Sequence, residues 1–253
     1  MELITSDDVR LEARRWFTDS PPRATVVLVH GFTASRSEAR VVELATALLG
    51  AGVAVLAYDA RGHGDSGGEA TLGDVEDRDV AAAVAAVAGD GIPVVVVAAS
   101  MGAIAAVRYV ASGPDSVAGV VAVSCPARWR LPRNARGLAS ALLTRTPLGR
   151  RLARERMGVR IARGCAQAAP PVELVGALGV PLAIVHGRRD PFLDVDNAER
   201  LYAAASEPRR LVVVDELGHA FEAESVDAIL AAVAWCLDRA PSGEPTRREV
   251  DVP

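Results

Sequence analysis

Between residues 93 and 111 a run of β-branched residues, a serine among small residues and an alanine-rich stretch follow one another. The run Pro93–Ala98 (PVVVVA) is too short and too β-branched for a helix, which predicts a buried parallel strand. The stretch Ala103–Ala111 (AIAAVRYVA) is typical of a helix. Ser100 lies between them in AASMG, where small neighbours allow a strained strand-to-helix turn to close. The pattern predicts that the Ser100 hydroxyl projects from the sheet beside free N–H groups of a helix N-terminus.

The same alternation of apolar runs and helical stretches continues through most of the chain. Strands are expected at residues 9–17, 24–29, 53–58, 93–98, 117–124, 181–186 and 211–214, and helices at 35–49, 74–88, 103–111, 197–205 and 222–238. The first strand is expected to be antiparallel, Ser35 or Ser37 to cap the first helix, and Asp196 to cap the helix that follows it. Alternating strands and helices imply an α/β fold with a mostly parallel sheet covered on both faces. Reacting groups in such sheets lie at the carboxyl ends of the strands.

Length and composition exclude several classes of protein. A chain of 253 residues can form one large α/β domain, and it contains no apolar run of the roughly 18 residues that a membrane span needs. The N-terminus lacks the apolar region of a secretory signal. Three widely spaced cysteines (Cys125, Cys165 and Cys236) predict reduced thiols in a cytoplasmic protein, without a disulfide framework or a zinc site. The net charge of −4 predicts no binding to nucleic acid.

Ser100 is either the N-cap of a helix or a nucleophile, and a nucleophilic serine needs a base. The chain has four histidines. His219 follows the last expected strand on a loop that leads into the final helix, which favours it as the base. The other three, each beside a glycine, are expected to be buried and to shape their loops: His30, His63 and His186.

A serine–histidine pair also needs an acid that orients the imidazole. Asp190 lies on the loop after the strand at 181–186 and upstream of His219, although an aspartate before a proline is often only a turn residue. Asp190 is favoured over four alternatives, because Asp196 suits a helix cap and two of the others lie very near His219 in sequence. The four are Asp194, Asp196, Asp215 and Glu216.

The order Ser100, Asp190, His219 is the order of the α/β-hydrolase triad. Five segments in succession resemble motifs of the α/β-hydrolase superfamily, most closely small bacterial carboxylesterases and lysophospholipase-like or monoacylglycerol-lipase-like serine hydrolases. The segments are VVLVHGF (26–32), YDARGHGDSGG (58–68), AASMG (98–102), HGRRDPF (186–192) and ELGHAFE (216–222). One departure is Ala98, which replaces the first glycine of G-x-S-x-G.

The resemblance implies specific roles for these residues. Ser100, Asp190 and His219 would form the catalytic triad, and the backbone N–H groups of Phe32 and Met101 would form the oxyanion hole. No metal or organic cofactor is needed for this chemistry. The serine at the turn argues against the dehalogenase and epoxide-hydrolase relatives, which carry aspartate there.

The resemblance also divides the chain. Residues 1–125 and 171–239 would form the hydrolase core, residues 126–170 a basic helical lid, and residues 240–253 a disordered tail. Between Arg128 and Arg163 the lid carries eleven arginines and a single acid, which gives this stretch a charge of +10. Two short amphipathic helices separated by Pro147 are expected. Their arginines either merely face water, attract anionic acyl substrates, or bind an anionic membrane surface weakly.

The predicted function is hydrolysis of carboxylic esters of small or medium acyl substrates through an acyl-enzyme. An acyl thioesterase is the main alternative among enzymes, and peptidase or C–C hydrolase activity would use the same residues. A ligand-binding protein on the same fold is an alternative of a different class. The sequence leaves the natural substrate and the oligomeric state open.

Overall fold

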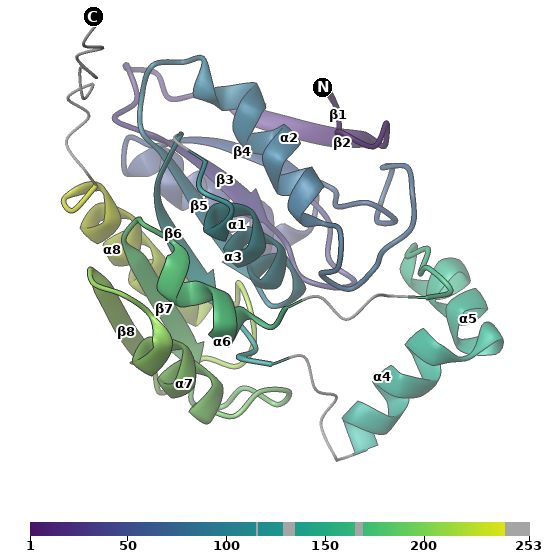
Figure 1. Ribbon diagram of the computed structural model, residues 1–253. Coiled ribbons are helices and arrows are strands. Elements are labelled where there is room, and N and C mark those ends of the chain that lie inside the picture. The colour runs from purple at the N-terminus through teal and green to yellow at the C-terminus, as the bar shows by residue number, and fades with distance from the viewer. Residues whose placement is uncertain (115, 129–134, 165–168, 241–253) are drawn as a thin grey trace, which may run out of the picture.

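A single eight-stranded sheet forms the centre of the protein, as the alternation of strands and helices predicts (Figure 1). The computed structural model describes residues 1–114, 116–128, 135–164 and 169–240. The strand order is β1-β2-β4-β3-β5-β6-β7-β8. The first two strands pair antiparallel and the remaining six run parallel. The strands are β1 (Glu2–Ile4), β2 (Arg10–Trp16), β3 (Thr25–Val29), β4 (Ala54–Tyr58), β5 (Val94–Ala99), β6 (Val117–Val123), β7 (Leu182–Gly187) and β8 (Arg209–Val214).

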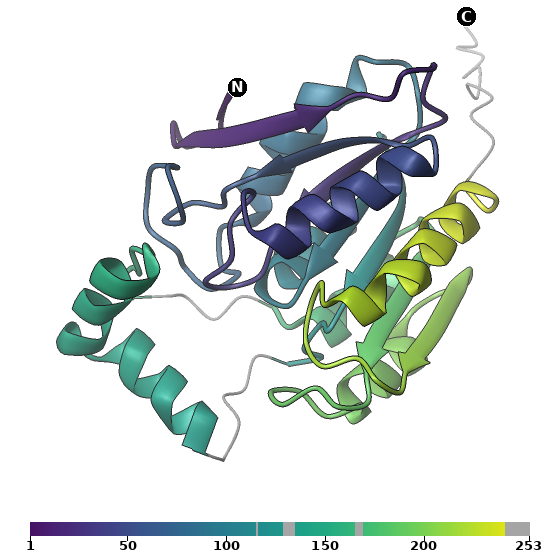
Figure 2. The same cartoon turned by 180° about the vertical axis from the view of Figure 1, so that it is seen from behind.

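Helices cover both faces of this sheet. On one face lie α1 (Ala39–Gly50) and α8 (Val226–Leu237), which are in front in Figure 2. On the other lie α2 (Asp77–Ala88), α3 (Met101–Ala111) and α7 (Asp196–Ala204). Every residue of β3, β4, β5 and β7 is buried, since both faces of these strands are covered. This is why they consist of unbroken apolar runs rather than alternating patterns.

The structure corrects several predicted element boundaries. The short strand β1 was not predicted, and neither were α6 (Pro171–Leu174) and the adjoining 3-10 turn Val175–Ala177. Helix α2 begins at Asp77 rather than Asp74, because the Glu76 carboxylate accepts hydrogen bonds from the N–H groups of Thr71 and Gly73 and holds a turn there. The last helix begins at Val226, after a separate 3-10 turn over Ala223–Ser225.

Two predicted helix caps are wrong. Helix α1 has Glu38 at its N-cap, and the Ser35 hydroxyl lies 3.1 Å from the Ser37 hydroxyl instead of capping the helix. The N-cap position of α7 is occupied by Val195, which makes no side-chain capping hydrogen bond. Asp196 is the first residue of the helix and forms an ion pair with Arg200 one turn later. In both cases the side chain prefers a near neighbour in sequence to the free N–H groups of the helix.

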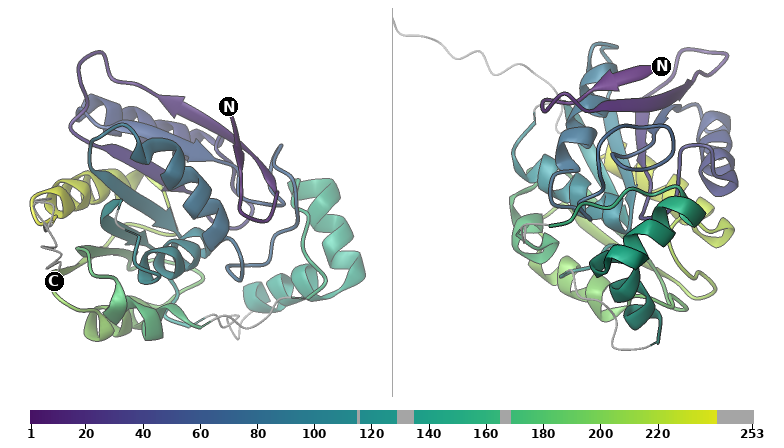
Figure 3. Two further views of the ribbon diagram at one scale, coloured as in Figure 1. Left: turned by 45° about the horizontal axis from the view of Figure 1, so that its top comes forward. Right: turned by 90° about the vertical axis from the view of Figure 1, so that its right-hand side faces the viewer.

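The helices α4 (Ala135–Arg145) and α5 (Pro147–Met157) extend away from the sheet (Figure 3). They correspond to the two predicted helices on either side of Pro147. Thr146 is the N-cap of α5 and its hydroxyl accepts a hydrogen bond from the Gly149 N–H. After α5 the chain returns to the core, where Val159 and Ile161 pack with Ala70 and Ala153. The predicted insertion at 126–170 and tail at 240–253 lie partly outside the described residues, namely at 129–134, 165–168 and 241–253.

None of the helices within the described ranges is both long and apolar enough to cross a bilayer.

Candidate active site

Ser100 lies in a strained turn between β5 and α3. Its backbone angles are φ 52° and ψ −116°, outside the regions that non-glycine residues commonly adopt. Ser100 is the N-cap residue of α3, but its side chain makes no capping hydrogen bond. The turn is held by the Ser100 N–H, which donates to the Val123 carbonyl on β6 at 3.0 Å. Its hydroxyl is therefore not used to stabilise the helix, which is the arrangement a nucleophile requires.

Close backbone contacts explain which residues around this turn must be small. A Cβ atom at Gly102 would lie 2.4 Å from the His30 carbonyl oxygen and 2.8 Å from that of Val29, so only glycine fits there. A Cβ at Gly31 would lie 3.2 Å from the Ser100 Cβ. Ala98 instead belongs to β5 and is fully buried in the core beneath α2 and α3. An alanine is accommodated in place of the usual first glycine because that residue is in the strand rather than in the turn.

His219 and Asp190 come together at the ends of β8 and β7. The imidazole Nδ1 lies 2.7 Å from the Asp190 Oδ2. The other carboxylate oxygen of Asp190 accepts hydrogen bonds from the N–H groups of Phe192 at 2.8 Å and Leu193 at 3.0 Å. Burial acts to raise the pKa of Asp190, but the hydrogen bond from His219 and these two N–H groups lower it overall. An ionised Asp190 leaves Nδ1 protonated and Nε2 free to accept a proton.

Three of the four alternative acids are paired with arginines on the surface. Asp215 forms an ion pair with Arg188 at 2.7 Å, and Glu216 accepts a hydrogen bond from Arg189 at 2.8 Å. Asp196 is paired with Arg200, and the Asp194 carbonyl accepts from Asn197 at the start of α7. Among these acids the structure brings Asp190 to His219.

The loops that carry Asp190 and His219 are packed against each other through Gly187. A Cβ at Gly187 would lie 2.3 Å from the carbonyl oxygens of both Leu217 and Gly218. His186, also buried, donates from Nε2 to the Leu193 carbonyl at 3.0 Å and so holds the Asp190 loop. The expectation that His186 shapes its loop is confirmed.

Two buried histidines fix the loop after β3. His30 lies between the Gly31 carbonyl at 2.8 Å and the Ala60 N–H at 3.0 Å, and burial with the nearby His63 lowers its pKa to about 3. Burial also lowers the pKa of His63, whose Nε2 accepts a hydrogen bond from the Thr33 N–H at 3.3 Å. Both imidazoles are therefore neutral. As predicted, they are buried and shape their loops, since they hold the backbone on either side of Phe32.

Phe32 and Met101 offer the backbone N–H groups expected to form an oxyanion hole. Met101 is the first residue of α3, and the first N–H groups of a helix have no acceptor within it. Phe32 lies beside the turn, on the loop whose Gly31 contacts Ser100. Gly31, which precedes Phe32, and Met101, which follows Ser100, thus both lie beside Ser100.

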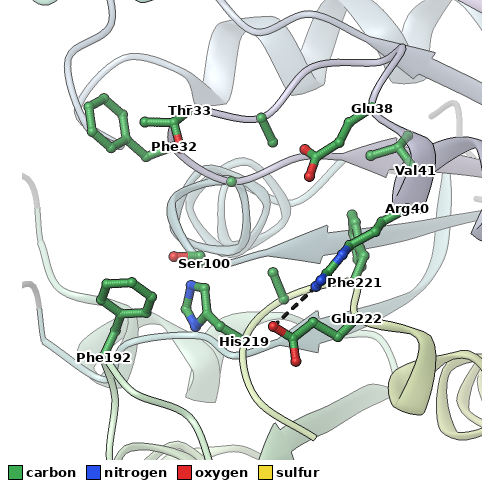
Figure 4. A pocket seen from close by; sticks show the side chains of 13 residues that line it. Phe32, Thr33, Glu38, Arg40, Val41, Ser100, Phe192, His219, Phe221 and Glu222 are labelled. Atoms are coloured by element: carbon green, nitrogen blue, oxygen red, sulfur yellow. Dashed lines mark ion pairs between the residues drawn. The ribbon is translucent and has the colours of Figure 1, made fainter. Parts of the chain in front are cut away.

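A cavity of about 280 Å³ joins these elements (Figure 4). Ser100 and His219 lie at one end of it. Phe192 stacks edge-on against His219 with ring centroids 5.0 Å apart, which places an apolar group beside the imidazole. At the other end Arg40 and Glu222 form an ion pair of 3.1 Å. The cavity therefore has an apolar wall at the reactive end and a charged wall away from it.

Among the described residues no cluster of three or more His, Cys, Asp or Glu side chains is arranged to hold a metal ion. Cys125 and Cys236 are buried and unpaired, and burial raises the pKa of each to about 12. Such thiols remain protonated and inert. Cys165 lies outside the described residues.

A family model described as "Serine aminopeptidase, S33" matches residues 20–152, which is more than half of the chain. The chain belongs to this hydrolase family. Human monoglyceride lipase is 35% identical over 129 residues, covering 48% of this chain and 41% of the human enzyme. The match therefore spans about two fifths of that relative's length. The family match over residues 20–152 includes Ser100 and the loop of Phe32.

Solved structures extend the similarity to nearly the full chain. An esterase of Pyrococcus furiosus is 25% identical with a TM-score of 0.70, covering 95% of this chain and 91% of that one. A monoacylglycerol lipase of Paleococcus ferrophilus is 22% identical with a TM-score of 0.66, covering 90% of this chain and 98% of that one. The predicted α/β-hydrolase fold is thus confirmed.

Sequence reasoning missed several residues of the site. Arg40, Glu222 and Phe192 line the cavity, and Ser124 contacts the His219 loop. Ser124 directly follows β6, so the rule that reacting groups gather at carboxyl strand ends could have found it. Arg40 and Glu222 carry no such signal, because nothing local in the chain indicates that α1 and the start of α8 meet.

Proposed function

We propose that this protein is a serine hydrolase that cleaves carboxylic esters of small or medium acyl groups through an acyl-enzyme. The observation that carries the proposal is the 2.7 Å hydrogen bond between Asp190 and His219 at the cavity that also holds Ser100. The activities named for the similar proteins, an esterase and two monoacylglycerol lipases, support an ester as the substrate.

In the proposed reaction, the Ser100 Oγ attacks the ester carbonyl carbon while His219 Nε2 takes the hydroxyl proton. Asp190 stabilises the imidazolium that forms. The carbonyl oxygen becomes an oxyanion held by the N–H groups of Phe32 and Met101, and such a hole contributes about 3–4 kcal/mol of transition-state stabilisation. The C–O bond to the alcohol then breaks, and His219 returns its proton to the departing oxygen. A water molecule, deprotonated by His219, attacks the acyl-enzyme and releases the carboxylic acid and free Ser100.

Covalent labelling tests this proposal directly. A fluorophosphonate probe should modify Ser100, and Ser100→Ala should abolish both labelling and ester hydrolysis. Ser112→Ala is a matched control at the other end of α3, where the Ser112 hydroxyl only donates to the Tyr109 carbonyl. This control should label and turn over like the unmodified protein. An intact protein that remains unlabelled and inactive would instead favour a ligand-binding role.

A substrate panel separates the alternatives within the enzymes. We expect p-nitrophenyl esters of short and medium acyl groups to be cleaved with higher kcat/KM than acyl-CoA thioesters or aminoacyl p-nitroanilides. Higher efficiency on the thioesters would indicate a thioesterase, and higher efficiency on the anilides an aminopeptidase such as the family description names. Either result would replace the ester as the substrate while leaving Ser100 as the nucleophile.

We also propose that residues 126–170 act as a lid over the core formed by residues 1–125 and 171–239. The described part of the lid carries large exposed apolar side chains. Among them, Leu148 is 75% exposed to solvent and Leu142 is 54% exposed. Arg151 of α5 is 74% exposed and pairs with Glu155 in the same helix. A surface both apolar and basic suits anionic lipid or anionic acyl substrates.

A further inference from the structure

The end of β6 lies between the strands that carry the proposed nucleophile and the proposed acid. Strand β6 pairs with β5 on one side and with β7 on the other. Ser100 follows β5, and the Asp190 loop follows β7. Val123, the last residue of β6, and Ser124, which follows it, therefore lie between the serine turn and the strand that leads to Asp190.

Three hydrogen bonds connect this strand end to the elements around it. The Val123 carbonyl accepts from the Ser100 N–H at 3.0 Å. The Ser124 N–H donates to the Val185 carbonyl on β7 at 2.9 Å. The Ser124 hydroxyl accepts from the Ala220 N–H at 3.1 Å, and Ala220 is the residue after His219. One strand end thus links the serine turn, the strand of the acid and the histidine loop.

Both partners of the Ser124–Ala220 hydrogen bond have positive φ angles, which are unfavourable for residues other than glycine. Ser124 has φ 46° and Ala220 has φ 60°, although neither is a glycine. Such conformations persist only where surrounding contacts enforce them, and they gather at functional sites. Ser124 is fully buried, so water does not compete for its hydroxyl. The Ser124–Ala220 hydrogen bond is therefore well placed to keep the His219 loop in its strained conformation.

We propose that Ser124 is a positioning residue that sets the location of His219 relative to Ser100. Ser124 does not line the cavity, so it acts through the loop and not on the substrate. Asp190 fixes the imidazole from its Nδ1 side, while Ser124 fixes the backbone to which the imidazole is attached. This inference rests on the proposed function, since it assigns Ser124 a role in the pairing of Ser100 with His219.

The test is Ser124→Ala, which removes the hydroxyl and leaves the rest of the side chain. We expect kcat on p-nitrophenyl esters and the rate constant of fluorophosphonate labelling at Ser100 to fall about tenfold, with KM unchanged. The matched control is Thr25→Val. The Thr25 hydroxyl is also fully buried on a strand, but it has no hydrogen-bond partner in the described part of the chain. The control should keep its kcat and labelling rate.

Ser124→Gly covers the case in which Ser124→Ala fails to fold, because glycine adopts φ 46° without strain while also lacking the hydroxyl. It should show the same loss of kcat and labelling. Unchanged kcat and labelling in either folded variant, or a loss of kcat no larger than that of Thr25→Val, would overturn the inference. If Ser100→Ala remained active, the proposed function itself would fail, and that result is distinct from active Ser124 variants with an inactive Ser100→Ala.

Discussion

The carboxyl ends of β5 to β8 and the helices α4 and α5 are stabilised by different kinds of contact. At the strand ends, backbone atoms approach so closely that Gly102 and Gly187 have no room for a Cβ atom. In α4 and α5, large apolar side chains are exposed, and the two helices pack mainly on each other (Figure 3). The first region fixes the positions of the residues proposed for catalysis, and the second presents a surface. We infer that the chemistry depends on the strand ends and that α4 and α5 affect access.

The segment that follows α5 joins the two helices to the core at the loop of residues 62–70. Val159 and Ile161 pack with Ala70, and the Arg160 N–H donates to the Gly62 carbonyl at 2.7 Å. The Ala70 N–H also donates to the Arg160 carbonyl at 2.7 Å, and the Ala162 N–H donates to the Ala70 carbonyl at 3.0 Å. These contacts hold the segment after α5 against the loop at residues 62–70, and none of them involves the ends of β5 to β8. Substitutions in the two regions should therefore affect different kinetic parameters.

The largest expected effect is at Asp190. Asp190→Asn keeps the size of the side chain but no longer stabilises the imidazolium form of His219, so kcat should fall by about 10³–10⁴-fold. Steady-state kinetics on a p-nitrophenyl ester measures this. Asp215→Asn is the control, because Asp215 is an exposed acid paired with Arg188, and its kcat should be unchanged. Equal losses in the two variants would contradict the assignment of Asp190.

A smaller effect is expected at the serine turn. Gly102→Ala introduces a Cβ that meets two backbone carbonyl oxygens, and overpacking of this kind costs about 1–3 kcal/mol of unfolding free energy. Denaturant titration and labelling of Ser100 should both show a loss. Gly50→Ala is the control at the end of α1, where a Cβ would meet nothing within 4 Å. It should leave labelling unchanged and stabilise the protein slightly. A Gly102→Ala protein as stable and reactive as the control would contradict the claim that the serine turn requires glycine at position 102.

Substitutions in α4 and α5 should weaken binding to lipid vesicles without changing kcat. The pair of substitutions Leu148→Ser and Leu152→Ser removes two exposed apolar side chains one helical turn apart. We expect binding to vesicles containing anionic lipid to weaken several-fold, measured by co-sedimentation, with kcat on a water-soluble ester unchanged. Arg200→Gln on α7 changes charge away from this region and should not alter vesicle binding. A fall in kcat on the soluble ester would mean that the two regions are coupled more tightly than their contacts indicate.

The smallest effect is in the pH dependence of stability. The pKa of Asp190 is lowered in the folded protein from its ordinary value of 3.8. A carboxyl with a lowered folded-state pKa adds stability above its unfolded-state pKa, and this contribution disappears as pH falls through the lowered value. The Tm difference between the unmodified protein and Asp190→Asn should shrink as the pH falls below about 4. A difference that stays constant or grows on acidification would contradict the lowered pKa.

The fold class and the residues proposed for catalysis could be predicted from the order of residues along the chain. Unbroken apolar runs such as Pro93–Ala98 identify buried parallel strands, and the order of the strands indicates which residues lie at their carboxyl ends. Ser100 and His219 were identified on this basis. The predicted caps of α1 and α7 were wrong because competing contacts between near neighbours decided them.

Which side chains meet depends on how the chain packs in three dimensions. Asp190 pairs with His219 while Asp215, much nearer to His219 in sequence, points outward to Arg188. The contact of Ser124 with Ala220 joins residues 96 positions apart. Local preferences specify strands, turns and helices, but such pairs depend on strand order and on the close approach of loops. Strand order and loop contacts are properties of the assembled sheet, because they arise from packing between segments that have no contact until the chain folds.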